Sequence, residues 1–154
     1  MIKINIVTNY NNWKNYLPNP DNFIQKRVKN LNRKFYQYKK NIIFFTLLLS
    51  GNNKIKKLNK KFRNKDRTTD VLSFPFYNKR DLKIKLKKEK EIYLGDIIIN
   101  LNKIRNKNDK KNFKLEFNKL WIHGLVHLFG YDHKKNRDFS KMRKLEKKFL
   151  SYID

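Results

Sequence analysis

The histidines are the residues whose type and spacing best suit chemistry. All three of them, His123, His127 and His133, fall within the stretch HGLVHLFGYDH. His123 and His127 are four residues apart, so on a helix their side chains lie one above the other on the same face, about 6 Å apart. This spacing allows two imidazoles to share one metal ion.

A glycine between the second and third histidine could bring the third to the same ion. Gly130 follows His127 by three residues, where a helix can end in a left-handed turn that glycine adopts without strain. The chain can then turn back, which lets His133 reach the site. Three neutral imidazoles suit Zn²⁺ and leave its fourth tetrahedral position open, as in catalytic zinc sites. We therefore predict one Zn²⁺ ion and, because zinc lowers the pKa of a bound water to about 7, hydrolytic chemistry.

The spacing H-x-x-x-H-x-x-G-x-x-H is that of a metalloprotease signature with one difference. Such proteases place Glu directly after the first His as general base, whereas this chain has Gly124 there. Peptide hydrolysis is therefore disfavoured. A phosphate ester is favoured, because a metal ion and an arginine can suffice for its cleavage. Asp132 could accept the second ring N–H of a histidine or cap a turn, and both roles stay open.

Composition bounds the class of protein. The chain has 154 residues, enough for one domain over 1–154 with its own core. A formal net charge of +26 predicts attraction to polyanions, with nucleic acid as the first candidate and an anionic membrane as the second. Compositional drift on solvent-exposed faces is an alternative explanation for part of this charge. The chain has no cysteine, which excludes a disulfide-linked partner and agrees with a cytoplasmic location.

Periodicity indicates four strands. The N-terminal segment alternates Ile with polar residues, and the apolar run at 42–49 is a buried strand that is too short to span a membrane. The segment 71–76 contains Pro75, which argues for an edge strand or a strand end. The stretch around Ile97 and Ile99 is the fourth strand, in which Gly95 suggests a bulge or a close approach of two backbones.

Helices fill much of the remaining chain. One helix follows Pro20, with Asp21 as candidate N-cap, and a short helix surrounds Ile55. The basic segment 79–90 is expected to form a loop or an irregular hairpin arm. The helix that carries the histidines packs one face on the sheet, and a last amphipathic helix has Asp138 as its candidate cap. Four strands and four helices in this order predict an α+β domain with a mixed sheet.

Three stretches resemble the YbeY family of bacterial endoribonucleases. They are HGLVHLFGYDH, the segment LNKKFRNKDRTTDVLSFPF at 58–76, and LGDIIIN at 94–100. The resemblance implies that the three histidines are the metal ligands and that glycine is expected at position 124. It also implies a single α+β domain with an about four-stranded mixed sheet and a metal-binding helix similar to that of zinc-dependent proteases.

The second stretch adds candidates around the metal. The resemblance implies that Arg63 acts in catalysis, where a guanidinium would hold a phosphate or stabilise charge that develops on it. Thr69, Asp70 and Ser73 match the same block, and Asp70 could orient Arg63 or cap the start of the strand. Two differences affect the substrate loops: Thr68 stands where the family often has Pro, and the turn SGNN at 50–53 lacks the usual acidic residues.

By this resemblance the chain is expected to be a zinc-dependent, single-strand-specific endoribonuclease in the cytoplasm. It would act in maturation of ribosomal RNA, at the 3′ end of 16S rRNA, and in ribosome quality control. The expected partners are ribosomal RNA and the ribosome, with ribosomal proteins as further candidates. Two alternatives stay open: a non-catalytic, zinc-stabilised ribosome-assembly factor and, less favoured, a zinc metallopeptidase.

Overall fold

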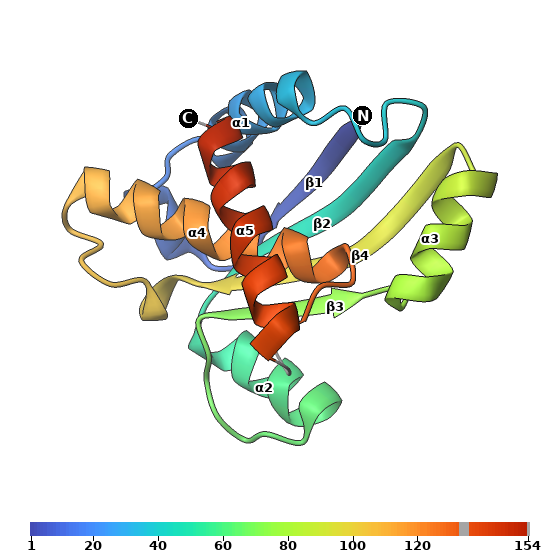
Figure 1. Cartoon of the computed structure of the whole chain (residues 1–154). Coiled ribbons are helices and arrows are strands. Elements are labelled where there is room, and N and C mark those ends of the chain that lie inside the picture. Colours follow the sequence, from blue (N-terminus) through green and yellow to red (C-terminus); the bar gives the residue numbers. More distant parts are fainter. Residues whose placement is uncertain (133–135, 154) are drawn as a thin grey trace.

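We describe a computed structural model, which covers residues 1–132 and 136–153 (Figure 1). The predicted third ligand, His133, lies outside the described residues. The strands are β1 (Ile2–Thr8), β2 (Ile42–Ser50), β3 (Val71–Pro75) and β4 (Glu91–Asn100). The helices are α1 (Pro20–Lys34), α2 (Asn52–Arg63), α3 (Lys79–Lys88), α4 (Lys110–Leu128) and α5 (Asn136–Ile153), with short 3₁₀ helices η1 (Asn11–Asn15) and η2 (Leu101–Lys103).

The strands form one mixed four-stranded sheet in the order β1-β2-β4-β3. Strands β1, β2 and β4 are parallel, and β3 runs antiparallel to β4 at the edge. Pro75 ends the edge strand β3, as its missing N–H predicted. The α+β class and the mixed sheet expected from the sequence are confirmed.

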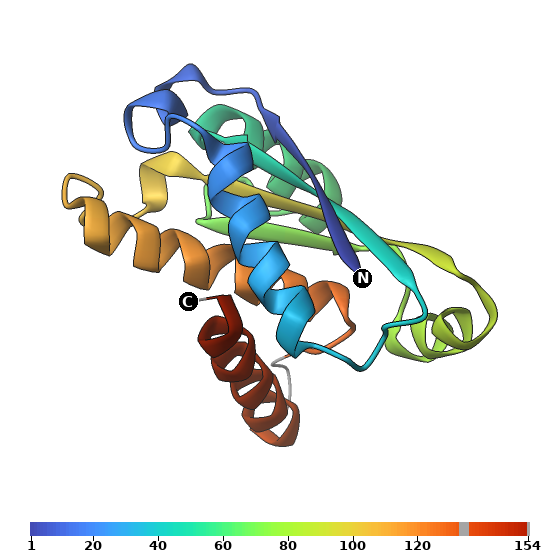
Figure 2. The same cartoon turned by 90° about the horizontal axis from the view of Figure 1, so that it is seen from above.

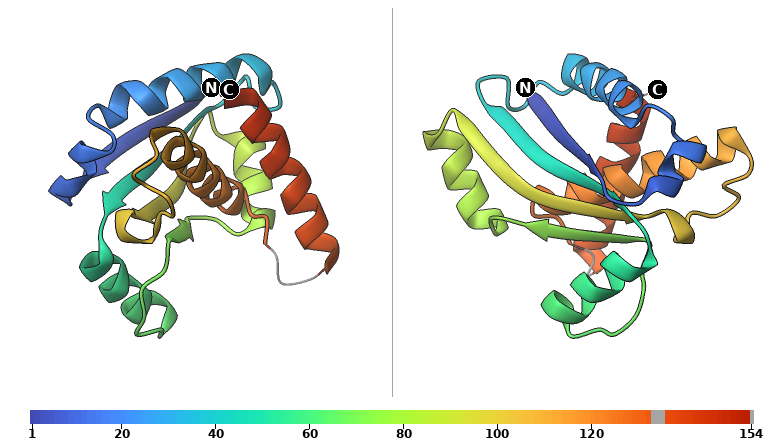
Figure 3. Two further views of the ribbon diagram at one scale, coloured as in Figure 1. Left: turned by 90° about the vertical axis from the view of Figure 1, so that its left-hand side faces the viewer. Right: turned by 180° about the vertical axis from the view of Figure 1, so that it is seen from behind.

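Helices cover both faces of the sheet, as the views in Figures 2 and 3 show. Successive strand residues point to opposite faces. Leu47 and Ile97 therefore face α1 and α4 and belong to the larger core, whereas Ile98 points the other way and packs with Leu72 and with Ile55 of α2. Helix α5 lies outside α1 and α4 and packs against both. Within the described residues no helix is long and apolar enough to cross a membrane.

The sequence prediction differs from the structure most clearly at 79–90. This segment was expected to be a loop or hairpin arm, but it contains α3. Asn78 caps that helix by accepting a hydrogen bond from Asp81 N at 2.9 Å, and Leu82 is buried. The strong N-cap and one anchoring leucine outweigh the run of basic residues, because the lysines can remain in solvent.

Two predicted caps are also shifted. The side chain of Asn19, not Asp21, accepts the hydrogen bond from Asn22 N at 3.0 Å, which leaves Pro20 at the first helical position. Asp138 lies in the first turn of α5, which begins at Asn136. The prediction for Gly95 is confirmed: its φ is 131°, and a Cβ there would lie 2.1 Å from Phe74 O.

Candidate active site

Helix α4 carries His123 and His127 into the space between the sheet and α5. Asp109 begins the helix by accepting from Lys111 N and Asn112 N at 2.8 and 3.0 Å. Several large side chains anchor it in the core, among them Phe113, Phe117, Trp121 and Leu125. With the helix fixed in this way, the Nε2 atoms of the two histidines lie 3.1 Å apart.

The other ring nitrogens of the two histidines have acceptors that favour one tautomer. His123 Nδ1 lies 2.6 Å from Glu146 Oε1 on α5, and His127 Nδ1 lies 2.8 Å from Tyr131 O. A carboxylate and a carbonyl oxygen accept hydrogen bonds, so both Nδ1 atoms donate, and a ring that donates from Nδ1 and binds a metal does so through its Nε2 lone pair. Two lone pairs that converge at 3.1 Å fit a shared cation, because zinc bonds of about 2.0–2.1 Å place tetrahedral ligands about 3.3 Å apart.

The turn after α4 has the conformation predicted for it. Gly130 has a φ of 81°, and its N–H donates to His127 O at 2.8 Å. A Cβ at this position would also lie 2.9 Å from Lys79 Cα. Both the backbone angle and the available space therefore favour glycine. Among the residues that the structure describes, no group of three His, Asp, Glu or Cys side chains gathers as metal ligands, so the role of His133 stays a prediction.

Gly124 explains why this helix has no glutamate after its first histidine. A Cβ at Gly124 would lie 2.7 Å from Ile97 Cγ2 on β4. This position therefore faces the sheet at close contact and not the side where the imidazoles converge. A longer side chain would push α4 away from the sheet, so the protease-type general base has no room here.

A cavity of about 990 Å³ lies beside the two histidines. Arg63 enters it from the last residue of α2, where Asn64 ends the helix with a φ of 54°. The Arg63 guanidinium donates from Nη2 to Ser73 O at 3.3 Å, which directs this exposed cation along β3 toward the cavity. The cavity is lined by all of the predicted site residues that the structure describes: Arg63, Thr69, Asp70, Ser73, His123, His127 and Asp132.

Two carboxylates, those of Asp70 and Asp132, line the cavity beside the histidines. Asp70 Oδ1 accepts from Val71 N at 2.8 Å and from Thr69 Oγ1 at 3.1 Å, so it caps the start of β3. This is one of the two roles predicted for Asp70. The Nδ1 atoms of His123 and His127 contact Glu146 and the Tyr131 carbonyl, and the role of Asp132 stays a prediction.

Comparison with known proteins agrees with this geometry. The family model for "Endoribonuclease YbeY" matches residues 8–154. The chain belongs to the endoribonuclease YbeY family.

Curated members of the YbeY family resemble this chain over nearly its full length. "Endoribonuclease YbeY" of Pelagibacter ubique is 42% identical and covers 99% of this chain and 97% of its own. The relative of the same name from Ehrlichia canis is 34% identical, with coverage of 99% and 93%. A solution structure of TM1509 from Thermotoga maritima superposes with a TM-score of 0.58 at 26% identity, over 99% of this chain and 89% of that one.

Some residues of this YbeY-family site were missed from the sequence. Glu146 has no motif around it; the only signal is that it is the single acidic residue in the basic stretch RKLEKKFL beside the buried face of α5. Tyr131 contributes a backbone carbonyl, which sequence cannot single out. Lys65 and Lys79 add positive charge to the cavity. Lys79 was missed because its segment was not expected to be a helix.

Proposed function

We propose that this protein is a zinc-dependent endoribonuclease that cleaves single-stranded segments of ribosomal RNA. The observation that carries the proposal is that a pair of imidazoles with converging lone pairs and a guanidinium line one cavity. A pair of metal ligands and a guanidinium are groups that can catalyse phosphodiester hydrolysis.

The ion would be held by His123 and His127, with His133 as the third ligand that the sequence predicts. Bound zinc supplies a Lewis acid and lowers the pKa of water. Glu146 and the Tyr131 carbonyl hold the two rings in the tautomer that can bind metal.

Arg63 is the residue that would bind the phosphate. Its planar guanidinium can donate two parallel hydrogen bonds to phosphate oxygens, which lysine cannot do. Lys65 and Lys79 line the same cavity and would attract the neighbouring phosphates of an RNA strand. Since Gly124 leaves no room for a glutamate base, this arrangement suits a phosphate ester better than a peptide bond.

The net charge of +26 supports a polyanionic substrate. We further propose that the RNA is the 3′ end region of 16S rRNA, that the protein acts on or near the ribosome in the cytoplasm, and that it serves ribosome quality control as well as maturation. These finer assignments rest on the resemblance to the YbeY family.

Cleavage of an rRNA precursor tests the proposal, after removal of contaminating nucleases. We expect His127→Ala and Arg63→Glu to lose activity by at least about a hundredfold, the usual cost of removing one essential electrostatic group. Arg105→Glu is the matched control, because Arg105 is an exposed arginine that does not line the cavity. Equal cleavage by all variants would refute the proposal and favour a non-catalytic assembly factor.

A further inference from the structure

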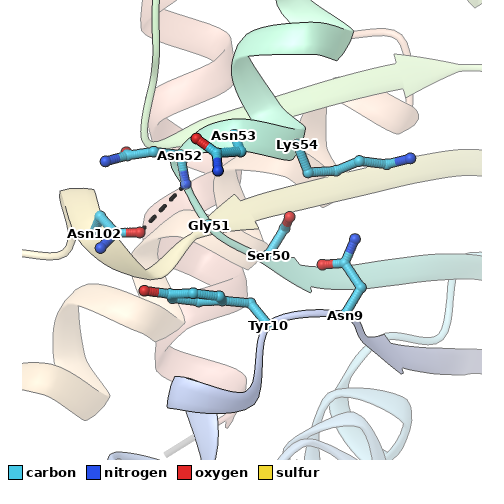
Figure 4. A pocket seen from close by; sticks show the side chains of 8 residues that line it. All are labelled: Asn9, Tyr10, Ser50, Gly51, Asn52, Asn53, Lys54 and Asn102. Carbon is cyan, nitrogen blue, oxygen red and sulfur yellow. Dashed lines mark hydrogen bonds between the residues drawn. The ribbon is translucent and has the colours of Figure 1, made fainter.

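A second pocket, of about 370 Å³, lies beyond the carboxyl ends of the parallel strands β1 and β2 (Figure 4). It shares no lining residue with the active-site cavity. Its lining contains no carboxylate, and it is rich in amides and hydroxyls: Asn9, Tyr10, Ser50, Gly51, Asn52, Asn53, Lys54 and Asn102. A polar, cationic pocket of this kind suits an anion.

The N-terminus of α2 opens into this pocket. Gly51 is the N-cap and brings no side chain to cap the helix, and the N–H of Asn52 donates to Asn102 Oδ1 at 3.3 Å. The first turn of this 12-residue helix contains no acidic residue. The N–H groups of Asn53 and Lys54 have no partner inside the helix, because they belong to its first turn. They therefore present donors and the positive end of the helix dipole to the pocket.

Ser50 gives an independent indication of a ligand. The residue is completely buried, yet among the described residues its Oγ has no hydrogen-bond partner. Its backbone is fixed, since its carbonyl accepts from Trp13 Nε1 at 2.9 Å. In Figure 4 the hydroxyl points toward the first turn of α2. A buried hydroxyl without a partner costs free energy, and a ligand that accepts its hydrogen bond removes that cost.

We propose that this pocket binds a phosphate group. The Ser50 hydroxyl, the backbone N–H groups of Asn53 and Lys54 and the Lys54 ammonium would donate to its oxygens. The side-chain amides of Asn9 and Asn53 lie at the same opening. Tyr10 closes one side, because its ring carbons would lie 3.1–3.2 Å from a Cβ at Gly51. The absence of carboxylates from the lining excludes the like-charge repulsion that would expel a phosphate.

The phosphate could belong to the RNA strand or to a free phosphate compound. Helix α2 connects the pocket with Arg63, and its 12 residues span roughly 18 Å. Buried Asn100 also joins the two regions: its Nδ2 donates to Asn52 Oδ1 at 2.8 Å and to Thr69 O at 3.0 Å, and Thr69 lines the active-site cavity. The RNA alternative rests on the proposed function, whereas phosphate binding itself does not.

Residue-resolved NMR titration of the full chain tests the proposal, with inorganic phosphate as one probe and an uncleavable single-stranded RNA as the other. We expect phosphate to shift the amide signals of Asn53 and Lys54. Ser50→Ala and Lys54→Gln should each weaken this binding about tenfold, since hydrogen bonds to charged groups are strong. Lys57→Gln is the matched control, an exposed lysine of the same helix that does not line the pocket, and it should change the affinity less than twofold.

The outcomes separate this site from the nuclease. Phosphate shifts at Asn53 and Lys54, with an affinity that Ser50→Ala lowers about tenfold, support the site even if no RNA is cleaved. Shifts of the same amides by RNA assign the phosphate to the substrate strand, and their absence with RNA assigns it to a free phosphate compound. No shift with either probe, or equal affinity in Ser50→Ala, would overturn the proposal. A lower melting temperature of Ser50→Ala would also overturn it, because the hydroxyl would then have a structural partner.

Discussion

At the scale of single residues, Glu146 is the clearest case of a site residue that the sequence did not predict, because it contacts Nδ1 of His123. The histidines could be predicted because they lie in one short stretch, and Arg63 because a longer motif contains it. Glu146 is 23 residues away from His123 along the chain. Only the packing of α5 on α4 brings the two together, so no local pattern could reveal the contact.

We expect Glu146→Gln to weaken zinc binding and RNA cleavage by about 10- to 100-fold, the usual effect of changing the partner of a metal-binding histidine. Glutamine keeps the size of the side chain but removes the charge that holds the Nδ1 hydrogen of His123. Zinc affinity is measured with a competing chelator. Glu116→Gln is the control, since Glu116 lies on α4 but pairs with Lys119. Unchanged zinc affinity in Glu146→Gln would show that the contact is only structural.

At the scale of elements, the periodicity of hydrophobic residues predicted the sheet and the histidine helix, because both bury continuous apolar faces. It did not predict α3, because that helix has one buried leucine among lysines and depends on its cap at Asn78. The close contact of α4 with β4 could not be predicted either. Gly124 was recognised as a departure from the protease signature, but the reason is Ile97 on a distant strand.

We expect Gly124→Ala to destabilise the protein by about 1–2 kcal/mol. Overpacking against Ile97 costs about 1–3 kcal/mol, and alanine returns up to about 1 kcal/mol through its higher helix propensity. Urea denaturation measures the free energy of unfolding. In an Ile97→Ala background the same substitution should become neutral or stabilising, because the methyl group then has space. An equal loss in both backgrounds would contradict the contact.

At the scale of the whole molecule, charge was evident from composition, but its distribution was not. If RNA is held through its backbone, affinity for a single strand should fall about a hundredfold between 50 and 200 mM salt for about five phosphate contacts. Fluorescence anisotropy with labelled RNA measures this dependence. A flat response to salt would mean that the net charge of +26 is compositional drift and not part of the interface.

The folded state should also lose stability at alkaline pH. The pKa of Tyr38 is raised above its ordinary value of 10.0, mainly by burial and to a lesser extent by the neighbouring Tyr131. The pKa of Tyr93 is raised above the same value, mainly by burial and to a lesser extent by its hydrogen bond to Asp96. The contribution of these two tyrosines to the free energy of unfolding is complete below pH 10.0, which is their pKa in the unfolded chain. It is lost as the pH rises through their raised pKa in the folded protein.

Urea unfolding at a series of pH values on both sides of 10.0 measures this loss. Tyr93→Phe cannot ionise, so its stability should fall less steeply in the alkaline range than that of the wild type. Parallel curves for the two proteins would contradict the raised pKa of Tyr93.

The most direct test of the proposed zinc site is X-ray absorption at the zinc edge of the purified protein. We expect one zinc ion per chain with three imidazole nitrogens at about 2.0–2.1 Å, and one imidazole fewer in His133→Ala. A wild-type spectrum without imidazole ligands, or a spectrum of His133→Ala with the same number of imidazoles as the wild type, would contradict the three-histidine site.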